Sequence, residues 1–176
     1  MADQATGSLW DFSLVIYRSE SVQVACLGLQ DRHGLDVNIL LLCCWLAARG
    51  EAIDRAGIDA VLAEMNEWQS TVVVPLRAIR RQMKGGIHPI PGKDAKVLRA
   101  RIKMLELEAE RIEQQQLEFV FAQRLHLPSG DSDRRGLAMA NLAAYFSALQ
   151  IEPGKEDTQD LNILADKSRR SDTTNP

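Results

Sequence analysis

The sequence lacks the residue patterns that mark the common catalytic and cofactor sites. It contains no HExxH, paired CxxC, phosphate-binding glycine loop or GxSxG nucleophile elbow. It has only three cysteines, Cys26, Cys43 and Cys44, at spacings that do not indicate a disulfide framework. These absences favour a protein that is not an enzyme, carries no cofactor or metal, and keeps its thiols reduced in the cytoplasm.

Long apolar runs are also missing. The most apolar run, Ile39 to Ala48, would cover about 15 Å as a helix, whereas a membrane span needs roughly 30 Å. The first residues, MADQATGSLW, have no basic region followed by an apolar stretch, so we expect no secretory signal. No segment alternates apolar and polar residues for long, which argues against a β-sheet.

The apolar residues that are present recur at helical spacing, and we predict an all-α fold. A compact N-terminal core of three helices, residues 8–50, precedes a long antiparallel helical hairpin, residues 58–125, and a short C-terminal helix, residues 136–150. Together they form one domain, residues 8–150. Residues 152–176 contain few large apolar side chains and many polar ones, so we predict a disordered tail there.

Local capping signals predict where the N-terminal helices begin and end. Ser8 followed by Asp11 resembles a capping box, Gly34 suits the left-handed position after the second helix, and Asp36 suits the N-cap of the third. The third helix is apolar nearly all round up to Gly50, so we expect it to be surrounded by neighbours. Its two cysteines are predicted to be buried structural residues rather than reactive thiols.

Two heptad seams predict the hairpin. The first helix carries apolar residues from Leu62 to Met83 at three- and four-residue spacing, with Gln69 in one polar slot. The second helix repeats the seam at Leu98, Ile102, Leu105, Ala109, Ile112 and Phe119. Because the loop between them is short, we expect the two seams to pack against each other. The β-branched run before Pro75 predicts a kink or break in the first helix.

A compact polar cluster lies just before the most apolar run and consists of Asp31, His33, Asp36 and Asn38. Two carboxylates and an imidazole could bind a small molecule or a divalent ion, and His33 could act as a general base. Alternatively, the aspartates end one helix and cap the next, while His33 and Asn38 form hydrogen bonds across the turn. We favour capping and keep the cluster as a candidate ligand site, with no catalytic residue or metal ligand assigned.

The net charge of −3 hides a basic segment near the hairpin loop. Between Arg77 and Lys103, nine lysines and arginines accompany one aspartate, which gives a local charge of +8. The basic residues nearest the loop form a predicted solvent-facing contact surface for an anionic partner: Arg77, Arg80, Arg81, Lys84, Lys93, Lys96 and Arg99. Nucleic acid, an acidic protein surface or an anionic membrane could supply that charge. A solvated face, or pairing with the glutamates from Glu106 to Glu113, is the alternative.

The N-terminal part of the chain resembles a known family. The matching features are LWDFSLVIY, ACLGLQD, HGLDVN and CCW, with weaker matches in WQSTVVVPLRAIRR and LELEAERIEQ. This family consists of small bacterial proteins described only as a domain of unknown function. The resemblance implies a small bacterial, cytoplasmic protein and assigns no activity, substrate or catalytic residue.

We predict a non-enzymatic interaction or adaptor protein that contacts an anionic partner through its basic hairpin tip. Another protein is the favoured partner, and nucleic acid is an alternative. The hairpin, basic at its tip and acidic at its base, would also permit homo-oligomers. The competing hypothesis is a small-molecule or metal-binding protein, with an enzyme among the options, whose site lies at the Asp31 to Asn38 turn.

Overall fold

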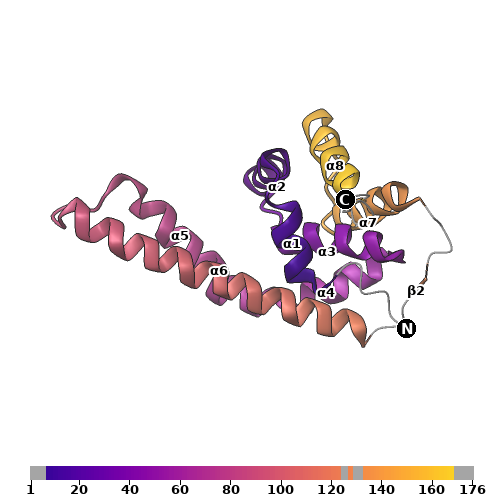
Figure 1. Cartoon of the computed structure of the whole chain (residues 1–176), viewed down its shortest axis with the longest axis horizontal. Coiled ribbons are helices and arrows are strands. Elements are labelled where there is room, and N and C mark those ends of the chain that lie inside the picture. The colour runs from indigo at the N-terminus through magenta and orange to yellow at the C-terminus, as the bar shows by residue number, and fades with distance from the viewer. Residues whose placement is uncertain (1–6, 124–126, 129–132, 169–176) are drawn as a thin grey trace, which may run out of the picture.

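A computed structural model describes residues 7–123, 127–128 and 133–168. The all-α prediction is confirmed, and a long helical hairpin projects from a more compact body (Figure 1). Among the described residues the strands are limited to one short antiparallel pair, β1 (Glu51–Ala52) with β2 (Leu127–Pro128). No helix in these ranges is both long enough and apolar enough to cross a bilayer.

The helices follow one another along the chain with short connections. In order they are α1 (Leu9–Ile16), α2 (Glu20–His33), α3 (Val37–Arg49), α4 (Arg55–Trp68), a π-helical turn η1 (Gln69–Val73), α5 (Val74–Gln82), a 3-10 turn η2 (Met83–Gly85), α6 (Gly92–Ala122), α7 (Arg134–Ala148) and α8 (Lys155–Lys167).

The predicted helix caps are confirmed. The Ser8 hydroxyl accepts a hydrogen bond from the Asp11 amide and completes a capping box at the start of α1. Gly34 ends α2 with a φ of 69°, a left-handed conformation that glycine adopts without steric cost. The Asp36 side chain accepts from the Asn38 amide, 2.9 Å away, at the start of α3. These contacts are local, which is why neighbouring residues were sufficient to predict them.

Helix α3 is the centre of the core. Its residues from Asn38 to Ala48 are all buried, and α7 covers it more extensively than any other helix does. The core that surrounds α3 therefore extends beyond residues 8–50 to α6, α7 and α8. A helix that is apolar on every side needs neighbours on every side, and here α1, α2, α6, α7 and α8 all contact it.

The predicted disorder of residues 152–176 is wrong for Lys155–Lys167, which form α8. Leu161, Leu164 and Ala165 lie on one face of this helix and are buried against α2 and α7. Three apolar residues at i, i+3 and i+4 are enough to pack this helix against the body, because α2 and α7 form the groove that receives them. Residues 169–176 of the predicted tail lie outside the described residues.

The irregularity expected before Pro75 takes the form of the π-helical turn η1. Proline has no amide hydrogen to donate, so the regular ladder is interrupted one turn earlier. The extra residue of a π-turn absorbs this interruption, and the helix continues into α5. The turn starts at Gln69, whose side chain is therefore directed at α3 and α6.

The second predicted seam of the hairpin is only half correct. Ile102 and Ala109 pack against the rest of the protein, together with Ala95, Leu117 and Val120. The other predicted members, Leu98, Leu105, Ile112 and Phe119, are 51%, 58%, 40% and 56% exposed. A heptad supplies two apolar positions per repeat. In α6, one of these positions packs against the rest of the protein and the other faces solvent.

Candidate functional site

The four residues of the predicted polar cluster have separate partners. Asp31 Oδ1 accepts a hydrogen bond from Arg81 at 2.9 Å, and His33 Nε2 lies 3.0 Å from Asp157 of α8. Asp36 caps α3, and Asn38 is buried beside α6. In the described part of the chain, no group of three or more His, Cys, Asp or Glu side chains is arranged to hold a metal ion. The cluster therefore divides into a surface half and a buried half.

The buried half continues into a polar network that joins three helices. The Gln69 amide nitrogen lies 2.6 Å from Asp36 Oδ2 and 2.7 Å from each carboxylate oxygen of Glu113. Asn38 Nδ2 donates to Glu113 Oε2 at 2.8 Å, and Gln114 Nε2 donates to Asn38 Oδ1 at 2.8 Å. Asp36 and Glu113 thus share one amide donor at a partly buried site.

Two neighbouring carboxyl groups that are shielded from water cannot both ionise at low cost. Burial, together with the neighbouring Asp36 carboxylate, raises the pKa of Glu113 to about 9. Burial also raises the pKa of Asp36, although hydrogen bonds from Glu113, Asn38 and Gln69 oppose that rise. At neutral pH Glu113 is therefore protonated and hydrogen-bonded to Asp36, whose carboxylate still caps α3. This network stabilises the contact of η1 and α6 with α3.

Four of the predicted basic contact residues have partners within the protein. Arg77 and Arg80 both pair with Glu106, and Arg77 also bonds Glu110 at 2.8 Å. Arg81 pairs with Asp31, and Arg99 Nε donates to the backbone carbonyl of Arg80 at 3.0 Å. Arg77 and Arg80 are half-buried, whereas helical spacing alone predicts a solvent-facing position. Their guanidinium groups join α5 to α6.

The remaining three predicted contact residues are the exposed lysines at the hairpin tip, Lys84, Lys93 and Lys96. No ion pair joins them to a residue in the described ranges. We call them the tip lysines. They lie where η2 ends and α6 begins, at the end of the hairpin farthest from the body (Figure 1). The basic surface that stays available is thus smaller than the sequence alone suggests.

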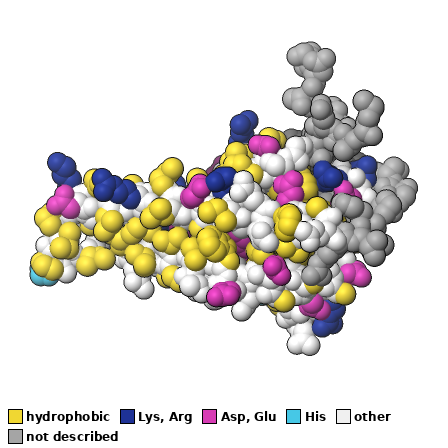
Figure 2. All heavy atoms as spheres, turned by 90° about the horizontal axis from the view of Figure 1, so that it is seen from below, with side chains coloured by type: hydrophobic (Ala, Val, Ile, Leu, Met, Phe, Trp, Pro, Cys, Tyr) yellow, Lys and Arg dark blue, Asp and Glu magenta, His cyan; other side chains and the backbone are white. Residues whose placement is uncertain are grey.

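The exposed heptad residues form a continuous apolar surface along α6. We call Leu98, Leu105, Ile112 and Phe119 the apolar stripe. Figure 2 shows hydrophobic side chains gathered along the underside of the hairpin and onto the adjoining body. At the base of the stripe, Ile112 and Phe119 line a groove of about 530 Å³ together with Met65 and Trp68 of α4. Sequence periodicity finds these residues but assigns them to the interior of the hairpin.

The buried network contains residues that the sequence did not single out as functional. Glu113 and Gln114 fall within a run of glutamates and glutamines on α6, where neither residue stands out. Gln69 did carry a signal, because it is a polar residue in an apolar seam. Such an interruption predicts a buried hydrogen-bond partner on a facing element.

Comparison with known proteins gives one match. A family model described as "Protein of unknown function (DUF2390)" matches residues 8–117. No curated protein and no solved structure matches the chain. The matched range contains the apolar stripe, except Phe119, and all of the buried network.

Proposed function

Because the chain belongs to this family, whose description states no activity, we propose a function from its geometry: a non-enzymatic cytoplasmic interaction protein that uses its helical hairpin as the contact element. One observation carries the proposal. Four large apolar side chains, spaced seven residues apart, are exposed along a helix that projects from the body. Soluble proteins seldom leave such a continuous apolar surface uncovered, and a seven-residue spacing suits a second helix as its cover.

The occupant that fits best is α6 of a second copy, running antiparallel. Under two-fold symmetry, Leu98 of one copy would lie opposite Phe119 of the other, and Leu105 opposite Ile112. The underside of the hairpin faces away from the helices of the body, so the bodies of the two copies would lie on opposite sides (Figures 1 and 2). The groove between α4 and α6 is then positioned to receive the partner's Leu98.

Charge supports the antiparallel direction. Residues 92–104 of α6 contain five basic residues and one acid, a formal charge of +4, whereas residues 105–122 contain five acids and one arginine, a formal charge of −4. Antiparallel pairing places the basic half of each helix beside the half that contains these glutamates. Glu106, Glu108 and Glu110 already pair with arginines of the same copy and Glu113 is protonated, so the direct attraction comes mainly from Glu118. Parallel pairing would place the two basic halves together and is disfavoured by their like charge.

The tip lysines give this dimer a second contact surface. In the antiparallel arrangement the two tips lie at opposite ends of the paired helices. Each tip can then contact an acidic surface of another protein, and the affinity is expected to fall as salt rises, because exposed charges are screened. The protein would act as an adaptor that joins two copies of one acidic partner.

The oligomeric state tests the proposal that the apolar stripe forms a dimer interface. We expect sedimentation equilibrium to give a dimer for the wild type and a monomer for the double variant Leu105→Ser, Ile112→Ser. Met104→Ser is the matched control, because Met104 is 64% exposed on the same helix but lies off the stripe. Circular dichroism should show unchanged helicity in both variants. A monomeric wild type, or a dimer that survives the double substitution, would rule out the second copy as the occupant.

A defined anionic probe tests the proposal that the tip lysines bind an acidic partner. We expect fluorescently labelled polyglutamate to bind the wild type at low salt and to lose most of its affinity for Lys84→Glu, Lys93→Glu, Lys96→Glu. Arg55→Glu is the control, since Arg55 is an exposed basic residue at the start of α4, away from the tip. If the wild type binds a short DNA duplex more tightly than polyglutamate, the partner of the tip lysines is nucleic acid and not an acidic protein. Equal binding of wild type and triple variant would exclude the tip as a contact surface.

A further inference from the structure

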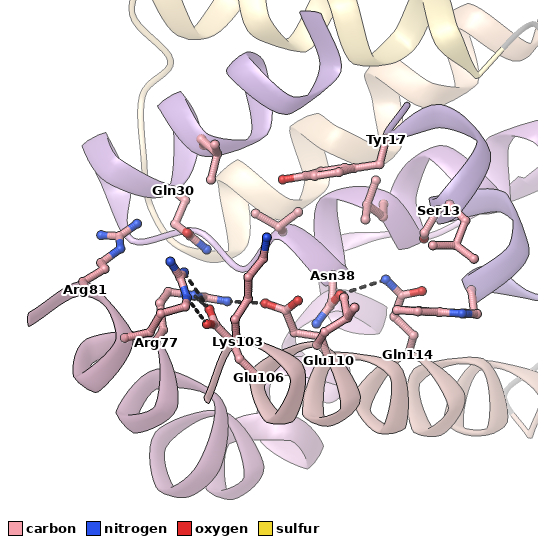
Figure 3. Close-up of a pocket in the computed structure, with 17 residues that line it drawn as sticks. Ser13, Tyr17, Gln30, Asn38, Arg77, Arg81, Lys103, Glu106, Glu110 and Gln114 are labelled. Carbon is pink, nitrogen blue, oxygen red and sulfur yellow. Dashed lines mark hydrogen bonds and ion pairs between the residues drawn. The ribbon is translucent and has the colours of Figure 1, made fainter. Parts of the chain in front are cut away.

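A pocket separate from the apolar stripe opens on the other side of α6. It has a volume of about 290 Å³ and lies between α1, α2, α3, α5 and α6 (Figure 3). An engineered cavity of about 150 Å³ holds one benzene molecule, so this pocket can hold a ligand of roughly a dozen non-hydrogen atoms. Most of its surface is apolar, with Leu14, Leu27, Leu41 and Leu107 among the lining side chains.

One end of the pocket has two buried polar atoms without a partner. The Ser13 hydroxyl and Gln114 Oε1 accept no hydrogen bond from any described residue, although these residues are only 4% and 2% exposed. The orientation of Gln114 is set by its neighbours, because its amide nitrogen donates to Asn38, whose own amide nitrogen donates to Glu113. Leaving such groups unpaired is costly, so a ligand that donates a hydrogen bond here would relieve the cost.

The other end of the pocket is cationic. Lys103 extends its amino group toward the pocket in Figure 3 and forms no ion pair with the described residues. Arg77, Arg80 and Arg81 line the same end, together with Glu106 and Glu110. Arg77 and Arg80 bond the two glutamates, and Arg81 pairs with Asp31. The positive charge that lacks a partner therefore resides on Lys103.

We propose that this pocket binds a monocarboxylate with an extended apolar chain and a hydrogen-bond donor at its far end. The carboxylate lies at Lys103, the chain lies against the leucines, and the terminal hydroxyl donates to Gln114 Oε1 and accepts from the Ser13 hydroxyl. Lys103 and Gln114 are eleven residues apart on α6, which corresponds to about 16 Å along the helix axis. A ten-carbon ω-hydroxy acid has a comparable extended length and about the right number of atoms.

Calorimetric titration with 10-hydroxydecanoate, decanoate and decylammonium tests the ligand class. We expect one saturable site for 10-hydroxydecanoate, several-fold weaker binding of decanoate, and no saturable binding of decylammonium. The difference between the two acids reports the hydrogen bonds with Ser13 and Gln114, and the difference between acid and amine reports the charge at Lys103. Equal affinities for the two acids in the wild type, or equal binding of the cation, would overturn the proposal.

Substitutions locate the binding. Lys103→Met should weaken 10-hydroxydecanoate about tenfold or more, the factor expected for losing one charge-assisted contact. Arg101→Met is the matched control, since Arg101 is an exposed basic residue on the same helix but does not line the pocket. Ser13→Ala should reduce the preference for the hydroxy acid over decanoate. Unchanged affinity in Lys103→Met would refute the site.

The ligand proposal for the pocket and the dimer proposal for the apolar stripe can be tested independently. The stripe variant Leu105→Ser, Ile112→Ser should bind 10-hydroxydecanoate as the wild type does, because neither residue lines the pocket. Loss of binding in that variant, with helicity intact, would instead assign the acid to the exposed stripe. A monomeric wild type that still binds the acid would remove the dimer proposal and leave the pocket in place.

Discussion

The Gln69 amide nitrogen lies 2.7 Å from both carboxyl oxygens of Glu113, which joins the π-helical turn of the hairpin to its second long helix. The same nitrogen lies 2.6 Å from Asp36 at the start of α3. A single donor thus connects the hairpin to the body through two carboxyl groups that cannot both be charged at low cost. This relationship makes the stability of the protein dependent on pH.

Glu113→Gln should flatten that dependence. The pKa of Glu113 rises from 4.5 to about 9 on folding. Between these values the folded state holds a proton that the unfolded state has released, so stability falls as pH rises from about 5 to 9. Glutamine can keep the hydrogen bonds without titrating, and the variant should exceed the wild type in stability at pH 8 by about 1 to 3 kcal/mol. Urea unfolding at several pH values measures this. Exposed Glu64→Gln serves as the control, and parallel pH profiles for Glu113→Gln and wild type would contradict the prediction.

Glu106→Gln should loosen the hairpin. Glu106 is buried and accepts hydrogen bonds from both Arg77 and Arg80, so losing its charge leaves two half-buried guanidinium groups short of a partner. We expect a loss of about 2 to 4 kcal/mol in unfolding free energy. Glu108→Gln is the control, because its pair with Arg111 is exposed and its removal should have little effect. Similar losses of unfolding free energy in the two variants would show that burial of the ion pair does not determine how much it stabilises the protein.

Leu164→Ala should destabilise the body through α8. Leu164 is fully buried, and deleting its side chain should cost about 2 to 5 kcal/mol. Ile163 on the same helix is only partly buried, so Ile163→Ala should cost less. Thermal unfolding measures both. Two variants that unfold like the wild type would indicate that α8 does not stay packed against α2 and α7 in solution.

The three cysteines should resist modification in the folded protein. Cys26, Cys43 and Cys44 are fully buried, and burial raises the pKa of Cys44 to about 11. Because the thiolate is the reactive form, a disulfide reagent should react only as the protein opens, and all three thiols should react together in urea. Ser21→Cys, at an exposed position, should react at once. Fast reaction of a native thiol in the wild type would contradict the burial.

The capping and heptad signals carried most of the fold prediction. Ser8, Gly34, Asp36 and Gly50 act at helix ends as predicted, because a cap depends on the residues within one turn of it. Helix α8 was missed because most of its side chains are charged or polar. Its buried residues have the right spacing, but the groove that receives them is built by α2 and α7.

The candidate site was less predictable. Asp36 and Asn38 were recognised as a cluster with Asp31 and His33, yet the structure turns the first two toward Glu113 and the other two toward Arg81 and Asp157. Likewise, Arg77 and Arg80 were placed on a solvent-facing surface but turn toward Glu106. These partners lie at least 26 residues away in sequence, so spacing along one helix carries no information about them.

By itself, the sequence determined the helical class, most helix ends and the heptad positions of α6, because hydrogen bonding and side-chain periodicity act over a few residues. Only the tertiary structure decided which heptad position became buried and which became the apolar stripe. It also brought Asp36, Gln69 and Glu113 together and left Ser13 and Gln114 unpaired at one pocket. Burial is a property of how distant elements pack, and one amphipathic helix can satisfy its local preferences with either face turned inward.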